Sequence, residues 1–345
     1  MPDVLTGAID RLASGRDLSA DEMSAVLAEI MSGNASEVQT AAILIALRTK
    51  GETIDEIVGL ARTMREFATP VRADVDDLID TAGTGGGRQT FNVSTTAALI
   101  AAGAGCAVAK HGNRSATGLS GSADVLEALG VRIDLGPEEV ARCIREAGFG
   151  FMFAPAHHGA TRHVIPVRKE LAVRTIFNFL GPLTNPAGAT RQVIGVSDVA
   201  FLETIAGALA RLGAERALVV SSDDGLDEMS TSGTTRVVEV DGGELRRYEL
   251  APEDMGLARA DFDELAGGLP AHNADVARRI LAGEPGAARD IAVLNAGAAV
   301  YVSGRVDSIA DGVRAAEAAI DDGAAARALE RLVALTVELS PGVTS

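Results

Sequence analysis

Two loops in the first part of this 345-residue chain combine glycine, hydroxyl and basic residues. The first covers residues 83–87 and leads into an alanine-rich segment that begins near Asn92. Its glycines let successive backbone N–H groups converge, and a helix that starts at Asn92 would add a partial positive charge. This pattern predicts a phosphate-binding loop. The second loop covers residues 110–122, where Lys110 and Arg114 add full positive charges.

The glycine loop alone is open to four interpretations: an ordinary turn between strand and helix, a dinucleotide fingerprint, a P-loop and a phosphoribosyl cradle. The spacing of Gly83, Gly85 and Gly86 lacks the third glycine of a dinucleotide site, and no Gly-Lys-Ser or Gly-Lys-Thr follows. The second loop offers Asn113 as donor and acceptor, together with several hydroxyls. These hydroxyls belong to Ser115, Thr117, Ser120 and Ser122. The pair of loops has room for two phosphates, with a solvated loop as the alternative.

Adjacent carboxylates follow an apolar run later in the chain. Asp227 and Glu228 come after residues 218–220, through a short loop that also contains Asp223 and Asp224. Carboxylates on a loop beyond a buried strand suit Mg²⁺, which combines a few carboxylate oxygens with water and substrate oxygens. We therefore predict that Asp227 and Glu228 hold a divalent metal; a solvated acidic loop is the alternative.

Other polar residues support less specific interpretations. Arg168 and Arg174 belong to a basic stretch, residues 162–174, which we expect to be one helix. It is either a surface helix or the source of an arginine that binds a carboxylate near a hinge. His157 and His158 could orient a substrate or pair with the backbone. No Ser-His-Asp order, zinc-ligand spacing or pair of catalytic carboxylates emerges.

Composition disfavours several classes of function. A net charge of −17 opposes binding to nucleic acid or to anionic membranes, because both need a basic surface. Cys106 and Cys143 cannot form a disulfide framework and lack metal-ligand spacing, so we expect two buried thiols in a reducing compartment. No run of about 18 apolar residues and no signal-peptide pattern occurs. We therefore expect a soluble, cytoplasmic protein.

Two patterns along the chain predict an α/β fold. Residues 1–70 carry apolar residues at helical spacing and capping-box pairs such as Ser36 with Gln39, which predict helices only. From about residue 76, apolar runs alternate with helical stretches, which predicts a mostly parallel sheet with ligands at the carboxyl ends of its strands. The predicted strands are residues 78–79, 107–109, 131–133, 192–196 and 216–220, with helices from Pro137 and at 202–212 and a hairpin at 236–245.

Residues 149–187 interrupt this alternation with asparagines, glycines and prolines, which predicts a hinge or crossing between domains. We expect a small all-helical N-terminal domain at residues 1–70, helped by a helical segment around 160–180. Residues 75–345 form the large α/β domain with a central mostly parallel sheet. The small domain has little core of its own, so it should pack on the large domain or on another copy of itself. The helices of the C-terminal third look structural.

Seven motifs occur in order along the chain: Gly83-Thr84-Gly85-Gly86, Asn92-Val93-Ser94-Thr95, Lys110-His111-Gly112-Asn113-Arg114, Ser120-Gly121-Ser122-Ala123-Asp124-Val125-Leu126-Glu127, Pro166-Val167-Arg168, Arg174-Thr175-Ile176-Phe177-Asn178 and Gly225-Leu226-Asp227-Glu228. Together they resemble the anthranilate phosphoribosyltransferases of tryptophan biosynthesis, a nucleoside phosphorylase-like class of phosphoribosyltransferases. The resemblance covers nearly the whole chain. It implies a cytoplasmic homodimer that joins anthranilate to phosphoribosyl pyrophosphate with Mg²⁺ and releases pyrophosphate.

The resemblance also implies roles for individual residues. Lys110, Asn113 and Arg168 would be catalytic, and Ser94, Asp227 and Glu228 would serve the metals. Anthranilate would be bound by Gly83, Asn113 and Arg168. The substrate-binding residues implied in all are Gly83, Gly86, Gly87, Thr90, Asn92, Val93, Ser94, Thr95, Lys110, His111, Gly112, Asn113, Arg114, Ser115, Ala116, Thr117, Gly118, Ser122 and Arg168.

The chain departs from the family pattern at three places. Family members usually have Asp after Gly-Thr-Gly-Gly and four residues before the threonine, whereas residues 87–89 supply three residues and no acid before Thr90. This chain has Thr117-Gly118 where the family usually has Ser-Ser. It has Gly159-Ala160-Thr161 where the family commonly has Pro-Ala-Met. We expect the missing acid to alter metal affinity or donor positioning. The alternatives are a pyrimidine nucleoside phosphorylase, which needs no metal, and a non-catalytic relative that binds nucleotides or nucleic acid.

Overall fold

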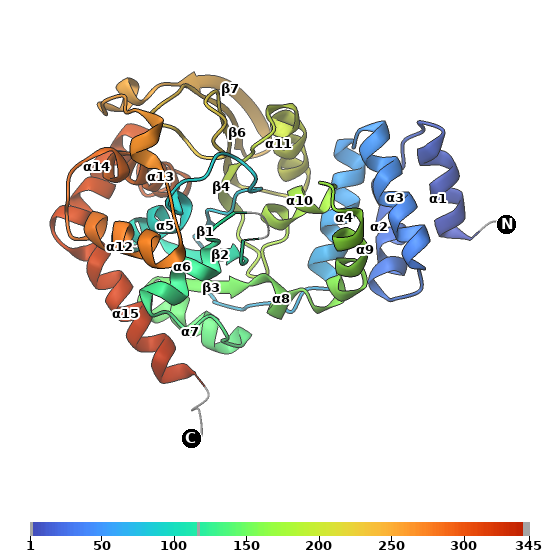
Figure 1. The fold of residues 1–345 in the computed structure, drawn as a ribbon, viewed down its shortest axis with the longest axis horizontal. Helices are drawn as coiled ribbons and strands as arrows, with labels where there is room; N and C mark the ends of the chain where they lie inside the picture. The colour runs from blue at the N-terminus through green and yellow to red at the C-terminus, as the bar shows by residue number, and fades with distance from the viewer. Residues whose placement is uncertain (1–2, 116–117, 341–345) are drawn as a thin grey trace.

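The computed structural model describes residues 3–115 and 118–340, in which four N-terminal helices lie beside a large α/β unit (Figure 1). As predicted, the first 70 residues form helices as their only regular elements within the described part. Ser36 and Thr53 begin α3 and α4 with complete capping boxes. The four helices are α1 (Val4–Ala13), α2 (Ala20–Met31), α3 (Glu37–Lys50) and α4 (Ile54–Glu66).

Seven strands form one sheet in the order β3-β2-β1-β4-β5-β6-β7. The first five in this order are parallel, and β6 and β7 add an antiparallel hairpin at one edge. The predicted α/β class with a mostly parallel sheet is confirmed. The strands are β1 (Leu78–Asp80), β2 (Ala107–Gly112), β3 (Phe149–Phe153), β4 (Arg191–Gly195), β5 (Arg216–Ser222), β6 (Thr235–Asp241) and β7 (Glu244–Leu250).

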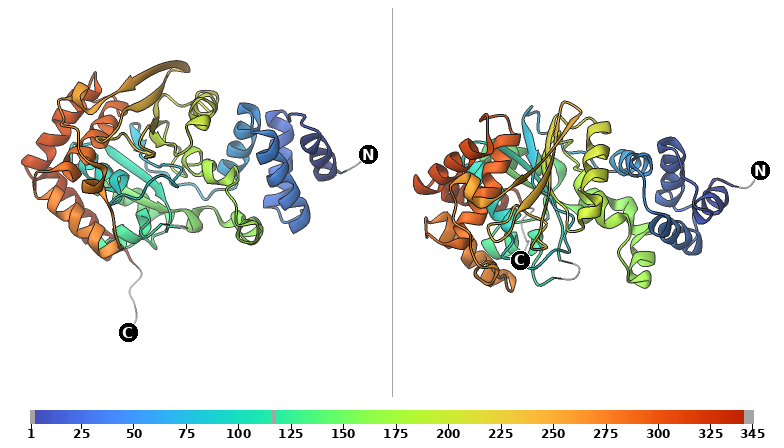
Figure 2. Two further views of the ribbon diagram at one scale, coloured as in Figure 1. Left: turned by 45° about the horizontal axis from the view of Figure 1, so that its top comes forward. Right: turned by 90° about the horizontal axis from the view of Figure 1, so that it is seen from above.

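Helices cover both faces of this sheet (Figures 1 and 2). Side chains alternate between two cores, with Val193 and Leu218 in one and Ile194 and Val219 in the other. The first core packs on α5 and α13, and the second on α11 and the N-terminal helices. The remaining helices are α5 (Val93–Gly103), α6 (Ser122–Leu129), α7 (Pro137–Ala147), α8 (Ala154–His157), α9 (Ile165–Leu171), α10 (Phe177–Leu180), α11 (Leu202–Arg211), α12 (Pro270–Leu281), α13 (Ala287–Val302), α14 (Ile309–Asp321) and α15 (Ala324–Leu339).

The segment around residues 160–180 packs with the N-terminal helices. Val164, Val167 and Ile176 share the core of α1–α4, and α9 contacts α3. In Figure 1, α9 lies against the N-terminal helices, and α10 lies between these helices and the sheet. These contacts support the expected grouping of this segment with the small domain, and the bounds 1–70 and 75–345 stay a proposal.

Two sequence-based predictions of elements are wrong. Residues 131–133 form no strand, because Val131 N–H donates to Leu126 O at 2.9 Å and Arg132 N–H donates to Thr336 Oγ1 at 3.2 Å. These bonds hold the segment against α6 and α15 instead of the sheet. The edge strand is β3, inside the stretch that the sequence suggested as an interruption.

The expected single helix over residues 162–174 is also wrong. A 3₁₀ turn covers Gly159–His163, and α9 begins only at Ile165 with Pro166 in its first turn. The helix ends because Ala172 adopts a left-handed conformation with φ 52°. Arg174 therefore lies beyond the helix, which lets it reach another part of the molecule.

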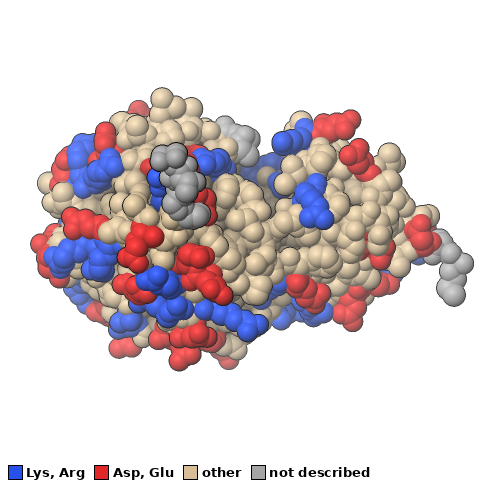
Figure 3. Space-filling view, turned by 90° about the horizontal axis from the view of Figure 1, so that it is seen from below, with Lys and Arg blue, Asp and Glu red and all other residues tan. Residues whose placement is uncertain are grey.

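Charged side chains of both signs are interspersed over the face of the molecule in Figure 3. The acidic excess behind the net charge of −17 is thus spread among basic residues on that face. Within residues 3–115 and 118–340, no helix combines the length and the hydrophobicity that a membrane span requires.

Candidate active site

A cavity of about 670 Å³ opens at the carboxyl ends of four adjacent parallel strands. β2 carries Lys110 two residues before its end at Gly112, and β1 leads into the glycine loop. β4 ends at Gly195, and β5 leads to Asp227 and Glu228. Parallel strands all end at the same edge of a sheet, so segments far apart in the sequence meet there. The loops that the sequence suggested as ligand-binding meet at this edge, and their binding of ligands stays a prediction.

Most of the residues implied by the resemblance line this cavity. Val93 does not, because its side chain is buried in the hydrophobic core. Ala116 and Thr117 lie outside the described residues. The implied residues that line the cavity are Gly83, Gly86, Gly87, Thr90, Asn92, Ser94, Thr95, Lys110, His111, Gly112, Asn113, Arg114, Ser115, Gly118, Ser122, Arg168, Asp227 and Glu228.

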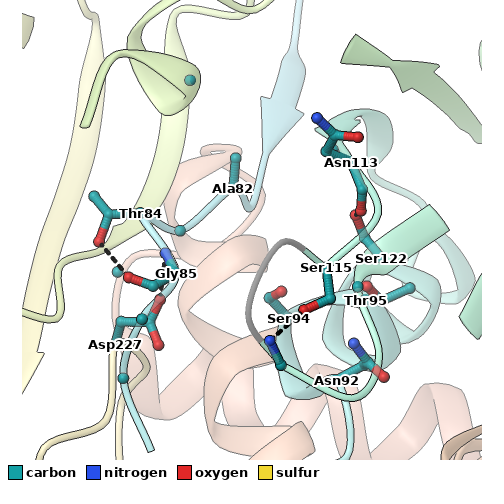
Figure 4. A pocket seen from close by; sticks show the side chains of 18 of the residues that line it. Ala82, Thr84, Gly85, Asn92, Ser94, Thr95, Asn113, Ser115, Ser122 and Asp227 are labelled. Carbon is teal, nitrogen blue, oxygen red and sulfur yellow. Dashed lines mark hydrogen bonds between the residues drawn. The ribbon is translucent and has the colours of Figure 1, made fainter. Parts of the chain in front are cut away.

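The glycine loop wraps the side chain of Asp227 (Figure 4). Gly85 N–H donates to Asp227 Oδ2 at 2.9 Å, and a Cβ at Gly87 would lie 2.6 Å from Asp227 Oδ1. Arg174 lies against the same loop: its Nη2 donates to Gly85 O at 3.1 Å, and a Cβ at Gly86 would lie 1.6 Å from its Nη1. A side chain at Gly86 or Gly87 would therefore displace the guanidinium or the carboxylate that approaches the loop backbone.

Asp227 and Glu228 form a half-buried pair of like charges. Burial raises the pKa of Asp227, and burial together with the charge of Asp227 raises the pKa of Glu228 well above its usual range. The backbone N–H of Ser94 partly opposes the increase at Glu228. Two adjacent carboxylates that open to a cavity would suit Mg²⁺, which binds a few carboxylate oxygens and keeps several water ligands.

Lys110 is a buried cation at the floor of the cavity, with 1% of its surface exposed. Its Nζ donates to Thr81 O at 3.1 Å and to Thr81 Oγ1 at 3.0 Å, and it lies 3.5 Å from Ser94 Oγ. Burial lowers the pKa of Lys110 to about 8, although the charges of Asp80 and Glu228 favour its protonated form. A phosphate in the cavity would add its negative charge to those of Asp80 and Glu228 and stabilise the protonated form of Lys110 further.

Asp80 is the buried acid behind Lys110. Asn185 Nδ2 donates to its Oδ2 at 2.7 Å, and His111 N–H donates to its Oδ1 at 3.2 Å. Burial raises the pKa of Asp80 to about 6, against the opposing effect of Lys110. At neutral pH Asp80 is therefore ionised and supports the charge of Lys110.

The first turn of α5 and the second loop form the opposite wall (Figure 4). Thr95 Oγ1 is buried and has no hydrogen-bond partner among the described residues, so it is available to a ligand. Arg114 is engaged elsewhere: its guanidinium donates to Asp124 at 2.9 Å and bidentately to Glu127 at 2.5 and 2.9 Å. Its charge therefore holds the loop and adds little to the field in the cavity.

Arg168 reaches the cavity from α9. Burial lowers its pKa, and its guanidinium carbon lies 5.6 Å from the centre of the Phe177 ring. His111 also lines the cavity, and its Nδ1 lies 3.1 Å from Gly181 O. Burial lowers the pKa of His111 to about 3, so its imidazole is neutral at physiological pH. His158 packs against it with ring centres 5.0 Å apart.

Sequence reasoning missed part of the lining. The C-terminal third, which looked purely structural, supplies Gly267, Gly268 and Asn295 to the cavity. Asn295 accepts from Met229 N–H at 3.0 Å and donates to Met229 O at 2.8 Å, so it fixes the residue after Glu228. An asparagine within a very apolar helical run is a signal that could have been recognised, because a buried amide needs partners.

Two family models match the chain, one over the N-terminal helices and one over the α/β unit. The glycosyl transferase family a/b domain matches residues 75–326, and the glycosyl transferase family helical bundle domain matches residues 6–68. The fold and the site thus define a glycosyl transferase built from a helical bundle and an α/β domain.

Relatives narrow this class. An anthranilate phosphoribosyltransferase of Rubrobacter xylanophilus is 55% identical over 98% of this chain and 99% of its own length. The solved enzyme of the same name from Thermus thermophilus is 48% identical, with a TM-score of 0.91 over 96% of this chain and 99% of that one. That of Saccharomyces cerevisiae in complex with PRPP and Mg is 27% identical, with a TM-score of 0.88 over 98% of this chain and 99% of that one. The chain belongs to the anthranilate phosphoribosyltransferase family.

Proposed function

We propose that the chain transfers the phosphoribosyl group of 5-phosphoribosyl 1-pyrophosphate to the amine of anthranilate and releases pyrophosphate, a step of tryptophan biosynthesis. The observation that carries this proposal is one cavity that joins a glycine loop, a buried lysine, a half-buried carboxylate pair and an arginine from the helical segment. A diphosphate and a benzoate-type acceptor need those groups together.

The residues of the cavity divide between the two substrates. Lys110 and the first turn of α5 with Ser94 hold the phosphate groups, and Arg168 holds the anthranilate carboxylate. Asn113 and Gly83 complete the acceptor side. Displacement takes place at the anomeric carbon, where departure of pyrophosphate leaves positive charge on the ribose ring. Positioning accounts for most of the acceleration, since an arylamine attacks in its neutral form and needs no strong base.

Asp227, Glu228 and Ser94 would hold Mg²⁺. When bound, Mg²⁺ neutralises charge on the departing pyrophosphate. The yeast relative was solved with PRPP and Mg, which supports this assignment. Without a cation the two half-buried carboxylates repel each other, so the pair is suited to a site that is completed by metal and donor together.

We also propose a cytoplasmic homodimer. Large apolar side chains are exposed on neighbouring helices of the small domain, and α3 contacts both α1 and α9. A second copy of the chain would cover this surface. The exposed residues are Val4 on α1, Val38 and Ile45 on α3, and Ile165 on α9.

The decisive assay follows the loss of anthranilate fluorescence with phosphoribosyl pyrophosphate and Mg²⁺. The wild-type chain should consume anthranilate, and it should not split thymidine or uridine with inorganic phosphate. Phosphorolysis without anthranilate turnover would refute the proposal and favour a nucleoside phosphorylase.

The metal assignment is tested by Asp227→Ala combined with Glu228→Ala. We expect turnover to fall by about 10³-fold or more, because charge on the leaving group loses its stabilisation. Glu138→Ala combined with Glu139→Ala, on α7 and away from the cavity, is the matched control that also removes two adjacent acids. Wild-type activity of the first double variant at ordinary Mg²⁺ would rule out the assignment.

A further inference from the structure

Asn273, in the first turn of α12, does not line the cavity but holds residues that do. Its side chain is buried, with 1% of the residue exposed. Its Nδ2 donates to Asn92 Oδ1 at 2.8 Å, across 181 positions of the sequence. Its Oδ1 accepts from Gly268 N–H at 2.7 Å. Both ends of the Asn273 amide are therefore engaged with the lining of the cavity.

Asn92 is held in one orientation by these contacts. It precedes α5 with a left-handed backbone, φ 68°, and its side chain makes no capping bond to the helix. Its Nδ2 donates instead to Ser120 O at 2.9 Å. Because the Asn273 donor faces Asn92 Oδ1, only one orientation of the Asn92 amide satisfies both partners. The amide of Asn92, labelled in Figure 4, is thus fixed from outside the cavity.

The segment before α12 also packs directly on the glycine-loop side. Thr90 pairs with Ala266 in an antiparallel bridge, and a Cβ at Gly267 would lie 2.1 Å from Thr90 O. A chain of hydrogen bonds therefore runs from the backbone of this segment to the second loop. Its members are Gly268 N–H, the Asn273 amide, the Asn92 amide and Ser120 O.

We propose that Asn273 is a positioning residue for phosphoribosyl pyrophosphate: it fixes the Asn92 amide and thereby the spacing of the loops that bind this donor. The inference rests on the proposed function, in which Asn92 contacts the donor. A buried amide network with every group satisfied holds a single geometry, whereas the loss of one donor leaves Asn92 Oδ1 unpaired and its side chain free to turn.

The test is Asn273→Asp, which preserves the shape of the side chain and the acceptor for Gly268 N–H. A carboxylate oxygen then faces Asn92 Oδ1, and the carboxylate itself is tolerated in the first turn of a helix. We expect the KM for phosphoribosyl pyrophosphate to rise about tenfold while the KM for anthranilate changes less than about twofold. Asn273→Ala should give the same split with a lower Tm. If the alanine variant does not fold, the aspartate variant decides.

A matched control removes a buried hydrogen bond elsewhere. Thr336→Val, on α15, deletes the buried hydroxyl that accepts from Arg132 N–H, and should lower Tm without changing either KM. A wild-type KM for the donor in Asn273→Asp would overturn the inference, because packing and the Gly268 contact would then suffice. The double variant gives a second test. If Asn273 acts through Asn92, Asn273→Asp should raise the KM for the donor less in an Asn92→Ala background than in the wild-type chain; an undiminished rise would also overturn the inference. A wild-type chain that fails to turn over anthranilate would instead refute the proposed function.

Discussion

Binding of the donor should be lost as pH rises through about 8, because it depends on the protonated form of Lys110. The ammonium group is buried among neutral partners, Thr81 O, Thr81 Oγ1 and Ser94 Oγ, and burial lowers its pKa from 10.5 to about 8. For a base, the charged form is present below the pKa and disappears above it. With a pKa of about 8, about 90% of Lys110 is charged at about pH 7 and about 10% at about pH 9.

The value of kcat/KM for phosphoribosyl pyrophosphate should therefore fall about tenfold between about pH 7 and about pH 9, since this parameter reports the free enzyme. Asp80→Asn should move the decline to lower pH by about one unit, the low end of what a neighbouring opposite charge contributes. Asp80 is ionised over this interval, because its own pKa is about 6. The wild-type chain, which retains this charge, is the reference for the shift.

The assay is initial anthranilate consumption at limiting donor and saturating Mg²⁺ and anthranilate. His111 and His158 cannot produce the decline, because burial lowers their pKa values to about 3 and about 4. Lys110→Met should show low activity with no decline in this range. A wild-type profile that stays flat to about pH 9.5 would refute the assignment of the decline to Lys110. A decline at the same pH in Asp80→Asn would refute the electrostatic coupling of Lys110 to Asp80.

Two further predictions concern the glycine loop and the assembly. Gly86→Ala places a Cβ 1.6 Å from Arg174 Nη1 and should lower kcat/KM about tenfold. Gly85→Ala, also at positive φ but with nothing within 4 Å of its Cβ, carries the same backbone strain and controls for it; equal losses would contradict the predicted collision. Val38→Glu should halve the mass measured by sedimentation equilibrium, because it charges the proposed dimer surface. Leu269→Glu, equally apolar and 64% exposed but outside the small domain, should not, and a wild-type mass for the Val38 variant would disprove this interface.

The sequence predicted the strands that carry the site because each is an apolar run followed directly by polar loop residues. The strand at 216–220 and the carboxylates after it are the clearest case, since buried parallel strands are continuously apolar. The same signal failed at residues 131–133: Val131 and Ile133 are buried, but the N–H groups of Val131 and Arg132 donate to α6 and α15. Burial makes a run apolar whether or not its backbone joins a sheet, so hydrophobicity alone could not separate the two cases.

Contacts between distant segments were beyond sequence reasoning. Arg174 Nη2 meets Gly85 O across 89 positions, and Asn273 meets Asn92 across 181. The residues next to Arg174 or Asn273 in the sequence do not specify a partner, because the same local sequence is compatible with contacts to many distant segments. Arg174 was visible as a basic residue, but its role depended on where α9 ends, and that in turn depended on the left-handed Ala172.

The missing acid of the glycine loop is explained by the space around Asp227. In the shortened loop, a Cβ at Gly87 would lie 2.6 Å from Asp227 Oδ1 and 3.0 Å from Gly225 O. An aspartate at this position would have to shift the loop and would place a second carboxylate beside a half-buried one, which raises the energy of both. The loop closes without it: Arg88 N–H donates to Gly225 O at 3.1 Å, and the guanidinium carbon of Arg88 lies 3.2 Å from the centre of the Phe262 ring. The shortening and the loss of the acid are therefore one structural change, and it leaves Asp227 and Glu228 as the carboxylates of the proposed metal site.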